Sequence, residues 1–377
     1  MIPVSEPVVG DRELEYLTEC IRTGWISSAG TYLDRFEQEW ASYCGVRFGV
    51  AVSNGTAALH AAVASLHLEP GDEVIMPSFT IISCAQAVIY CGGVPVLVDA
   101  DPYTWCMDTD AVASRITERT RAIMPVHIYG HPVDMDPLTD LARTHGLRIV
   151  EDAAEVHGAE YQVGHATGEG RWRRCGGLGD TATFSFYANK LVTTGEGGMV
   201  LTDDEEVAAF LRRYRNLGFA PPRRFLHQEL AHNYRMTNLQ AAVGLAQIER
   251  IDEIVAKKRW MGSAYSERLG DIDGLQLPVE RPWARQVYWM YGVVLGEEHD
   301  LDAAVLAQRL LEREVQTRPF FLGMHEQPVL CERGLFAGER YPVTERIARR
   351  GLYLPSGLTI TEAQIDAVCS AVRAALT

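Results

Sequence analysis

Lysine is rare in this 377-residue chain, because only three of its 35 basic residues are lysines and the rest are arginines. Lys257 and Lys258 sit together in the polar pattern of a helix. Lys190 stands alone between an apolar run that ends at Phe186 and the glycines of segment 195–198. Arginine keeps its charge at any accessible pH, whereas a desolvated lysine can attack a carbonyl carbon as a neutral amine. We therefore interpret Lys190 as a candidate nucleophile, and the alternative is a solvated loop lysine.

A candidate anion seat lies in the stretch VSNGTAALHAAV. Here a predicted strand runs into Ser53, Asn54, Gly55 and Thr56, and a helix follows from Ala57. Free N–H groups and the positive end of the helix dipole attract anions, and a glycine lets the anion approach closely. Neither the P-loop spacing nor the dinucleotide-binding spacing is present. Taken alone, the stretch is more typical of an ordinary helix cap.

Asp152 is a third chemical candidate, because it ends a strand pattern in LRIVEDAAEVHG and is followed by two small alanines. A carboxylate at that point can hold a permanent partner charge at the floor of a crevice. A single Asp at a strand end is more often a helix cap.

The three candidates together fit one cofactor. Pyridoxal 5'-phosphate (PLP) needs a phosphate seat, a lysine for a Schiff base and a carboxylate that keeps the ring nitrogen protonated. Gly55 with Thr56, Lys190 and Asp152 match these three needs. The joint pattern is far more specific than any of its parts.

The elements that must position these residues alternate between strand and helix, which predicts a mostly parallel sheet covered on both faces. Ligands bind beyond the carboxyl ends of strands in such sheets. Strands are predicted at 48–53, 72–78, 94–100, 121–127, 147–153 and 181–187, and helices at 56–66 and 135–146.

The character of the chain changes after a long amphipathic stretch at 238–269. A strand at 286–295 and helices at 301–314 and 361–376 then predict a smaller α+β domain. We expect a large cofactor-binding domain at 1–250 and a small domain at 251–377. The glycine-rich segment 163–180 is interpreted as a surface loop.

Composition excludes several classes of protein. A net charge of −15 gives no basic surface for nucleic acid. The eight cysteines contain no C-x-x-C pair, so neither a metal site nor a disulfide framework is predicted. The first residues, MIPVSEPVVG, do not resemble a signal peptide, and no apolar run is long enough to span a membrane. We expect a cytoplasmic protein with no membrane partner.

Several segments, in order and over nearly the whole chain, resemble the DegT/DnrJ/EryC1/StrS family of sugar aminotransferases. They are GWISSAGTYLDRFEQEWASYCG, SNGTAALH, PVHIYGHPVDMDPL, EDAAEVHGA, SFYANKLVTTGEGGMV, HNYRMTNLQAA and TRPFF. The resemblance implies an α/β protein of PLP-dependent transferase fold type I, similar to aspartate aminotransferase. It also implies a homodimer whose active sites lie at the subunit interface.

The resemblance assigns roles to the cofactor residues. Lys190 would form the Schiff base and Asp152 would pair with the ring nitrogen, while Asn233 would reach the phosphate from the neighbouring subunit. The residues expected at the phosphate within the same chain are Gly55, Thr56, Ala57 and Ser185.

Two positions depart from the family pattern. Glu155 stands where most members have Gln, and either side chain can bond the phenolic oxygen of the cofactor. Ile81 stands where the family usually has an aromatic residue that stacks on the ring, so either Phe79 or Ile81 covers the ring face.

The implied reaction moves an amino group from L-glutamate to the keto carbon, predicted to be C4, of a nucleotide-linked 4-keto-6-deoxy sugar. PLP and its pyridoxamine form alternate, which predicts ping-pong kinetics. The substrate candidates match family segments near the sugar nucleotide, and each also has a structural alternative as a turn, anchor or core residue. They are Trp25, Ser27, Ser28, Arg318, Phe321 and His325.

Other functions of the same family and cofactor match the sequence less well. A related sugar dehydratase has histidine in place of the lysine, which Lys190 argues against. A non-enzymatic PLP-binding regulator usually carries a basic DNA-binding segment, and none is evident. The alternatives left open are family members that aminate a dTDP- or UDP-linked keto sugar or a keto-cyclitol.

Overall fold

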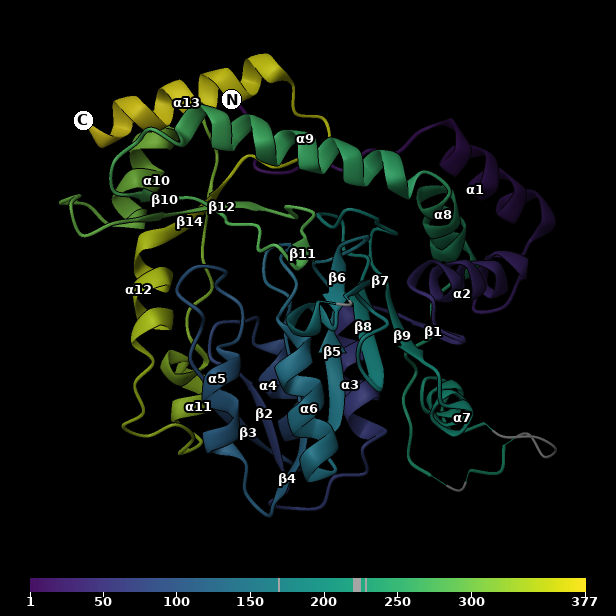
Figure 1. Ribbon diagram of the computed structural model, residues 1–377. Coiled ribbons are helices and arrows are strands. Elements are labelled where there is room, and N and C mark those ends of the chain that lie inside the picture. Colours follow the sequence, from purple (N-terminus) through teal and green to yellow (C-terminus); the bar gives the residue numbers. More distant parts are fainter. Residues whose placement is uncertain (169, 220–224, 228) are drawn as a thin grey trace.

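A seven-stranded sheet forms the centre of the molecule (Figure 1). The computed structural model describes residues 1–168, 170–219, 225–227 and 229–377. In their spatial order the strands are β1 (Phe48–Val52), β9 (Gly198–Thr202), β8 (Thr181–Ser185), β5 (Arg148–Asp152), β4 (Thr120–Ile123), β2 (Glu73–Pro77) and β3 (Val94–Val98). All neighbours pair in parallel except β9, which is antiparallel to β1 and β8. The predicted mostly parallel sheet is confirmed, and β9 is a strand that the sequence patterns missed.

Helices cover this sheet, which explains why β2 and β9 are buried at every residue. α3 packs against β1, β8 and β9. It starts directly after β1, where the Asn54 side chain accepts the N–H of Ala57 at 2.8 Å. The helices around the sheet are α3 (Gly55–Ala64), α4 (Ser83–Tyr90), α5 (Thr109–Val112), α6 (Met135–His145) and α7 (Glu205–Tyr214).

Three helices pack together beside the sheet, namely α1 (Asp11–Thr23), α2 (Thr31–Cys44) and α8 (Asn238–Ile248). The single amphipathic pattern at 238–269 forms two helices, because α8 ends before α9 (Ile251–Leu269) begins. Arg250 lies between the two helices and ties this point of the chain to the N-terminal segment. Its guanidinium donates to the Val8 carbonyl at 2.7 Å and to the Glu13 carboxylate at 2.9 Å.

A second hydrophobic core lies in the C-terminal part of the chain. Its sheet has the order β10 (Leu275–Gln276), β12 (Tyr291–Leu295), β14 (Gly351–Leu354), β13 (Arg318–Pro319). Its helices are α9, α10 (Ala303–Leu311) and α13 (Glu362–Leu376). Ile347 of α12 (Pro342–Arg350) and Leu330 of the short α11 (Pro328–Cys331) belong instead to the first core, around the seven-stranded sheet. Helices α9 and α13 lie side by side (Figure 1). The domain boundary at residue 250 stays a prediction.

Two further expectations are corrected by this part of the fold. The strand predicted at 286–295 begins only at Tyr291, because Val287 donates its N–H to Gly130 of the large-sheet region at 3.0 Å. The predicted surface loop at 163–180 contains a strand, β7 (Arg171–Arg174), which pairs with β6 (Glu160–Val163). With β11 (Ala284–Arg285) they form a small third sheet. Arginines dominate β7 and hide its strand pattern.

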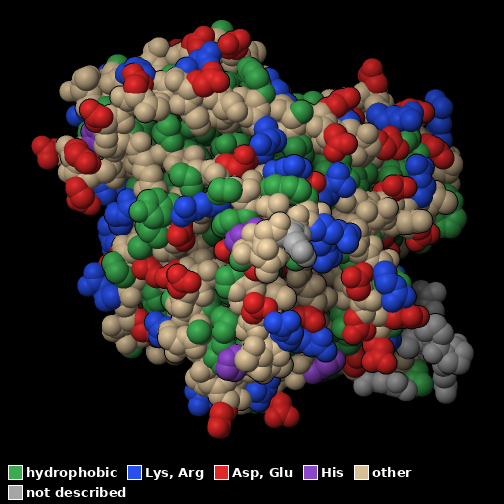
Figure 2. All heavy atoms as spheres, in the orientation of Figure 1, with side chains coloured by type: hydrophobic (Ala, Val, Ile, Leu, Met, Phe, Trp, Pro, Cys, Tyr) green, Lys and Arg blue, Asp and Glu red, His purple; other side chains and the backbone are tan. Residues whose placement is uncertain are grey.

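The surface carries mixed charges, and basic and acidic side chains are interspersed over the face drawn in Figure 2. The eight cysteines are free thiols, and only Cys331 is exposed. Among the described residues no helix is long and apolar enough to cross a membrane.

His131 makes the stability of the fold depend on pH. Its ring is buried, with Nδ1–H donating to the Pro132 carbonyl at 2.6 Å and Nε2 accepting the N–H of Arg281 at 3.3 Å. Burial lowers the pKa of His131 from 6.5 to about 4. Below pH 6.5 the unfolded chain therefore binds a proton at His131 that the folded chain does not bind until about pH 4. The contribution of the neutral ring to the unfolding free energy is complete above pH 6.5 and is lost as the pH falls toward 4.

We expect His131→Gln to remove this dependence. Between pH 7 and pH 5 the natural chain should lose about 2 kcal/mol more of its unfolding free energy than the variant. Urea unfolding of both proteins at the two pH values measures this difference. Equal losses in both proteins would contradict the expectation.

Candidate active site

A cavity of about 790 Å³ opens at the carboxyl ends of β1, β5 and β8. The parallel directions of these strands bring their ends to one edge of the sheet, which is where the sequence placed the polar clusters. The predicted residues that line the cavity are Gly55, Thr56, Ala57, Ile81, Asp152, Glu155, Ser185, Lys190 and Phe321.

Lys190 follows β8 in a turn that is closed by its N–H and the Tyr187 carbonyl at 2.9 Å. Its side chain is 9% exposed, and Nζ lies 3.6 Å from Oε1 of Glu155. The indole of Trp289 covers Nζ at 3.5 Å from the ring centroid. Burial lowers the pKa of Lys190, while the negative charges of Glu155 and Asp152 oppose this shift. A neutral amine is thus more accessible here than on a solvated lysine.

Asp152 is the last residue of β5 and is 2% exposed. Oδ1 accepts the N–H of Ala154 at 3.1 Å, and Oδ2 accepts the thiol hydrogen of Cys84 at 3.3 Å. Burial raises the pKa of Asp152, and these two donors and the charge of Lys190 counteract that rise. A carboxylate has about four lone-pair positions, so Asp152 retains capacity for a further, charged donor.

Glu155 is buried beside Lys190, and its Oε2 accepts the N–H of Tyr129 at 2.8 Å. Burial raises the pKa of Glu155 to about 7, against the opposing charge of Lys190. Glu155 and Lys190 can therefore share a proton near neutral pH.

The start of α3 forms the predicted anion seat. The Asn54 side chain accepts a hydrogen bond from the N–H of Ala57. The first-turn N–H groups of Gly55 and Thr56 have no partner within the helix. A Cβ on Gly55 would lie 2.7 Å from the Cβ of Ser185, so only glycine lets the helix meet the end of β8. The hydroxyls of Thr56 and Ser83 lie 3.0 Å apart and both line the cavity.

Ile81 and Phe79, the two candidates for covering the cofactor ring, differ in position. Ile81 lines the cavity and is 42% exposed. Phe79 is buried outside the cavity and packs against Tyr129, Phe320 and Phe321. The geometry favours Ile81.

Several predicted residues lie outside the cavity lining, and their roles stay predictions. His325 is buried, with Nδ1 2.8 Å from the Ser78 hydroxyl and Nε2 3.4 Å from the Glu345 carboxylate, so it has a structural role of its own. The others are Trp25, Ser27 and Ser28 in the turn between α1 and α2, the exposed Asn233 before α8, and the exposed Arg318 on β13.

The structure adds cavity residues that the sequence patterns did not single out. Trp289 and Tyr353 come from the C-terminal part of the chain, and no local pattern marks them as neighbours of Lys190. The added polar and aromatic residues are His60, Thr80, Ser83, Tyr90, Tyr187, Asn189, Glu196, Tyr234, Trp289 and Tyr353.

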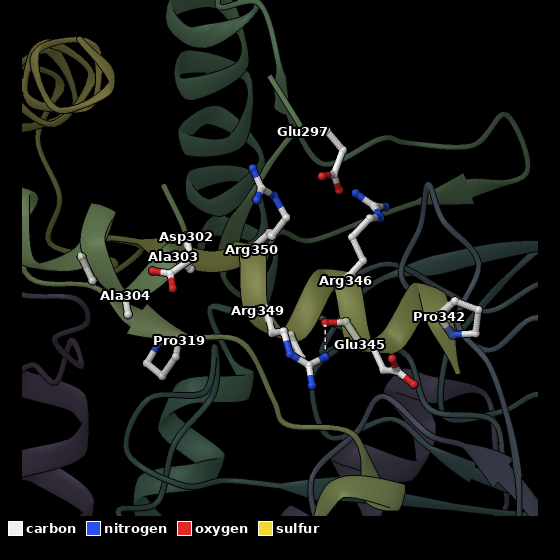
Figure 3. A pocket seen from close by; sticks show the side chains of 12 residues that line it. Glu297, Asp302, Ala303, Ala304, Pro319, Pro342, Glu345, Arg346, Arg349 and Arg350 are labelled. Atoms are coloured by element: carbon white, nitrogen blue, oxygen red, sulfur yellow. Dashed lines mark hydrogen bonds between the residues drawn. The ribbon is translucent and has the colours of Figure 1, made fainter. Parts of the chain in front are cut away.

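A second hollow lies between α10 and α12 (Figure 3), and it shares no lining residue with the cavity around Lys190. Its arginines are engaged within the chain: Arg349 donates to the Glu345 carbonyl at 3.0 Å, and Arg350 donates to the Leu295 carbonyl at 2.8 Å. It contains none of the predicted site residues.

His127, Glu151 and Cys175 form a buried cluster whose ligand types would suit a metal. The Glu151 carboxylate is already used, because it faces His127 Nε2 at 3.0 Å and accepts N–H groups from Gly176, Leu178 and Gly179. His127 Nδ1 accepts the N–H of Val133 at 2.8 Å. These bonds explain the cluster as a structural network.

A mostly parallel sheet with a buried lysine, two buried carboxylates and a helix N-terminus at one edge is the arrangement of a PLP-dependent transferase of fold type I. The chain belongs to the DegT/DnrJ/EryC1/StrS aminotransferase family, whose model matches residues 7–373. The predicted family, fold class and enzyme class are thereby confirmed.

Known proteins resemble the chain over nearly its full length. GDP-perosamine synthase of Caulobacter vibrioides is 43% identical over 98% of this chain and 97% of its own. GDP-perosamine synthase of Escherichia coli O157:H7 is 36% identical over 99% of this chain and 98% of its own. A crystal structure of DesI with its TDP-sugar product has a TM-score of 0.88 and 33% identity, covering 100% of this chain and 93% of DesI.

Proposed function

We propose that the protein transfers the amino group of L-glutamate to C4 of a GDP-linked 4-keto-6-deoxy sugar, as a GDP-perosamine synthase does. The observation that carries the proposal is the convergence of Lys190, Asp152 and Glu155 on one buried cavity beside the start of α3. The two relatives named GDP-perosamine synthase support the choice of substrate.

The residues of the cavity fit PLP. The α3 start with Ser185 would hold the phosphate, Asp152 would face the ring nitrogen and Glu155 the phenolic oxygen. When bound, PLP supplies an electron sink for the substrate carbon. Family membership bears out this cofactor, since a relative in Bacillus subtilis is itself named as pyridoxal phosphate-dependent.

Lys190 would carry the proton of the reaction. Its burial favours the neutral amine, and Glu155 at 3.6 Å can take the proton that the ammonium gives up. The neutral Nζ can then accept a proton from the carbon that bears the amino group of the donor. Trp289 covers one side of Nζ and keeps water away from it.

Family members that aminate a dTDP-linked sugar are the second candidate, because the similar DesI structure holds a TDP-sugar product. A panel of GDP-, dTDP- and UDP-linked 4-keto-6-deoxy sugars with L-glutamate, read by product mass, separates the two. We expect the amino sugar with the GDP-linked substrate. Turnover of a dTDP- or UDP-linked sugar alone would overturn the GDP assignment and leave the aminotransferase assignment in place.

The proposal includes a homodimer in the cytoplasm, with Asn233 completing the phosphate seat of the neighbouring subunit. Asn233 is exposed and lies outside the cavity of its own chain, on the segment that leads into α8. Such a segment is suited to presenting a side chain to a neighbour. In that arrangement cofactor binding and dimerisation strengthen each other.

Mixing inactive subunits tests this shared site. We expect Lys190→Ala chains and Asn233→Asp chains to be inactive separately, the latter because the new negative charge faces the phosphate. After subunit exchange, a mixed dimer has one site with both lesions and one with neither, so part of the activity should return. If exchange is confirmed and no activity returns, the seat is built within one chain.

A further inference from the structure

Lys258 is a buried lysine that faces backbone carbonyl groups. It lies on α9 and is 3% exposed. Its Nζ donates to the carbonyl of Trp289 at 2.8 Å and to the carbonyl of Ser356. Burial lowers the pKa of Lys258 to about 7, and no neighbouring charge among the described residues offsets that cost. Burying an amine without a carboxylate partner costs free energy unless hydrogen bonds compensate for the lost water. The two hydrogen bonds of Lys258 are therefore expected to stabilise the fold or the site.

Trp289 connects this lysine to the active site. Its carbonyl accepts the Lys258 bond, and its indole Nε1–H donates to the Asn189 carbonyl at 2.9 Å. The same indole ring lies 3.5 Å from Nζ of Lys190. Trp289 is 5% exposed and lines the cavity. One tryptophan thus touches both buried lysines, through its main chain and through its side chain.

The main chain around Trp289 has little freedom. Tyr288 has a φ of 47°, which is costly for a residue with a side chain. A Cβ on Gly130 would lie 2.6 Å from the Trp289 nitrogen, so the segment packs directly onto the backbone at Gly130. Such a conformation persists only where surrounding contacts hold it, and Lys258 supplies one of them from α9.

We propose that Lys258 is a positioning residue of the active site, because it holds the Trp289 main chain so that the indole covers Nζ of Lys190. The inference rests on the proposed role of Lys190. The electron-rich indole face favours the ammonium form of Lys190 and closes one side of it to water. The other titratable groups that face Lys190 are Glu155, Asp152 and His157.

The scarcity of lysine makes this inference measurable. The full-length chain without cofactor can be methylated reductively with formaldehyde and cyanoborohydride, and the three lysines are then separated by peptide mass. The pH dependence of the labelling rate gives the pKa of Lys190. We expect Trp289→Leu, which keeps apolar cover but removes the ring, to lower this pKa by about 0.5 to 1 unit.

Lys258→Met should shift the pKa of Lys190 in the natural background, because the indole no longer holds its place over Nζ, and have no further effect in Trp289→Leu. Lys257→Met is the matched control. Lys257 lies on the same helix, donates to the Ile360 carbonyl at 2.8 Å and covers the ring of Trp260, so it should leave Lys190 unchanged. If Lys258→Met does not fold, Lys258→Gln retains an N–H donor, and a shift smaller than that of Trp289→Leu is expected.

A folded Lys258→Met protein with an unchanged Lys190 profile would overturn the inference. A shift of equal size with and without Trp289 would also overturn it, because the effect would not pass through the indole. The labelling needs neither cofactor nor substrate. Failure of this coupling would therefore leave the proposed function intact, and failure of the proposed function would leave the coupling measurable.

Discussion

Lys190→Arg is expected to abolish transamination while the protein stays folded. A guanidinium keeps its proton at any accessible pH and does not form a productive covalent bond with a carbonyl carbon. Loss of the positioned proton carrier alone should slow turnover by roughly 10²- to 10⁴-fold, and loss of the nucleophile should slow it further. The positive charge beside Glu155 and Asp152 is conserved, so the two carboxylates keep a partner.

Steady-state rates with L-glutamate and the keto sugar, together with a melting curve, measure this effect. Lys257→Arg serves as the control, because it makes the same chemical change on α9 outside the cavity. Retained turnover in Lys190→Arg would mean that the site does not depend on an amine.

Asp152→Asn is expected to slow both half-reactions by about 10²- to 10³-fold, the usual cost of removing one electrostatic partner of a reacting centre. The amide keeps the oxygen that accepts the Ala154 N–H, so the end of β5 should remain folded. It loses the negative charge that favours protonation of the cofactor ring nitrogen.

Single-turnover experiments with each amino donor and acceptor separate the two half-reactions. Both should slow by similar factors, because the ring nitrogen serves both directions. Equal rates for Asn and Asp would show that Asp152 is a structural cap, which was the simpler interpretation of its sequence position.

Much of the site could be predicted because its residues follow strands directly. Asp152, Ser185 and the residues after Val52 are at strand ends, and parallel pairing brings those ends together without any knowledge of side-chain packing. Lys190 could be predicted for a different reason, because lysine is rare in this chain and Lys190 stands apart from the other two lysines.

The rest of the site depends on contacts between distant segments. Residues 286–290 belong to no strand and pack against Gly130, and this loop brings Trp289 to Lys190. The sequence pattern at 286–295 predicts a continuous strand there, so the loop could not be predicted. The contacts of His325 with Ser78 and Glu345 also join separate elements of the chain, and its role toward the substrate stays a prediction. Likewise, β7 was missed because charged residues can form a strand when a neighbouring strand pairs with them.

Borohydride reduction of the cofactor-loaded protein, followed by peptide mass analysis, tests the central claim most directly. Reduction should link the cofactor covalently to one lysine, and only three are available. Lys190 alone lies in the cavity that holds Asp152, Glu155 and the start of α3. We predict that the added mass is found on the peptide that contains Lys190. Added mass on Lys257 or Lys258 would contradict the assignment of the active site.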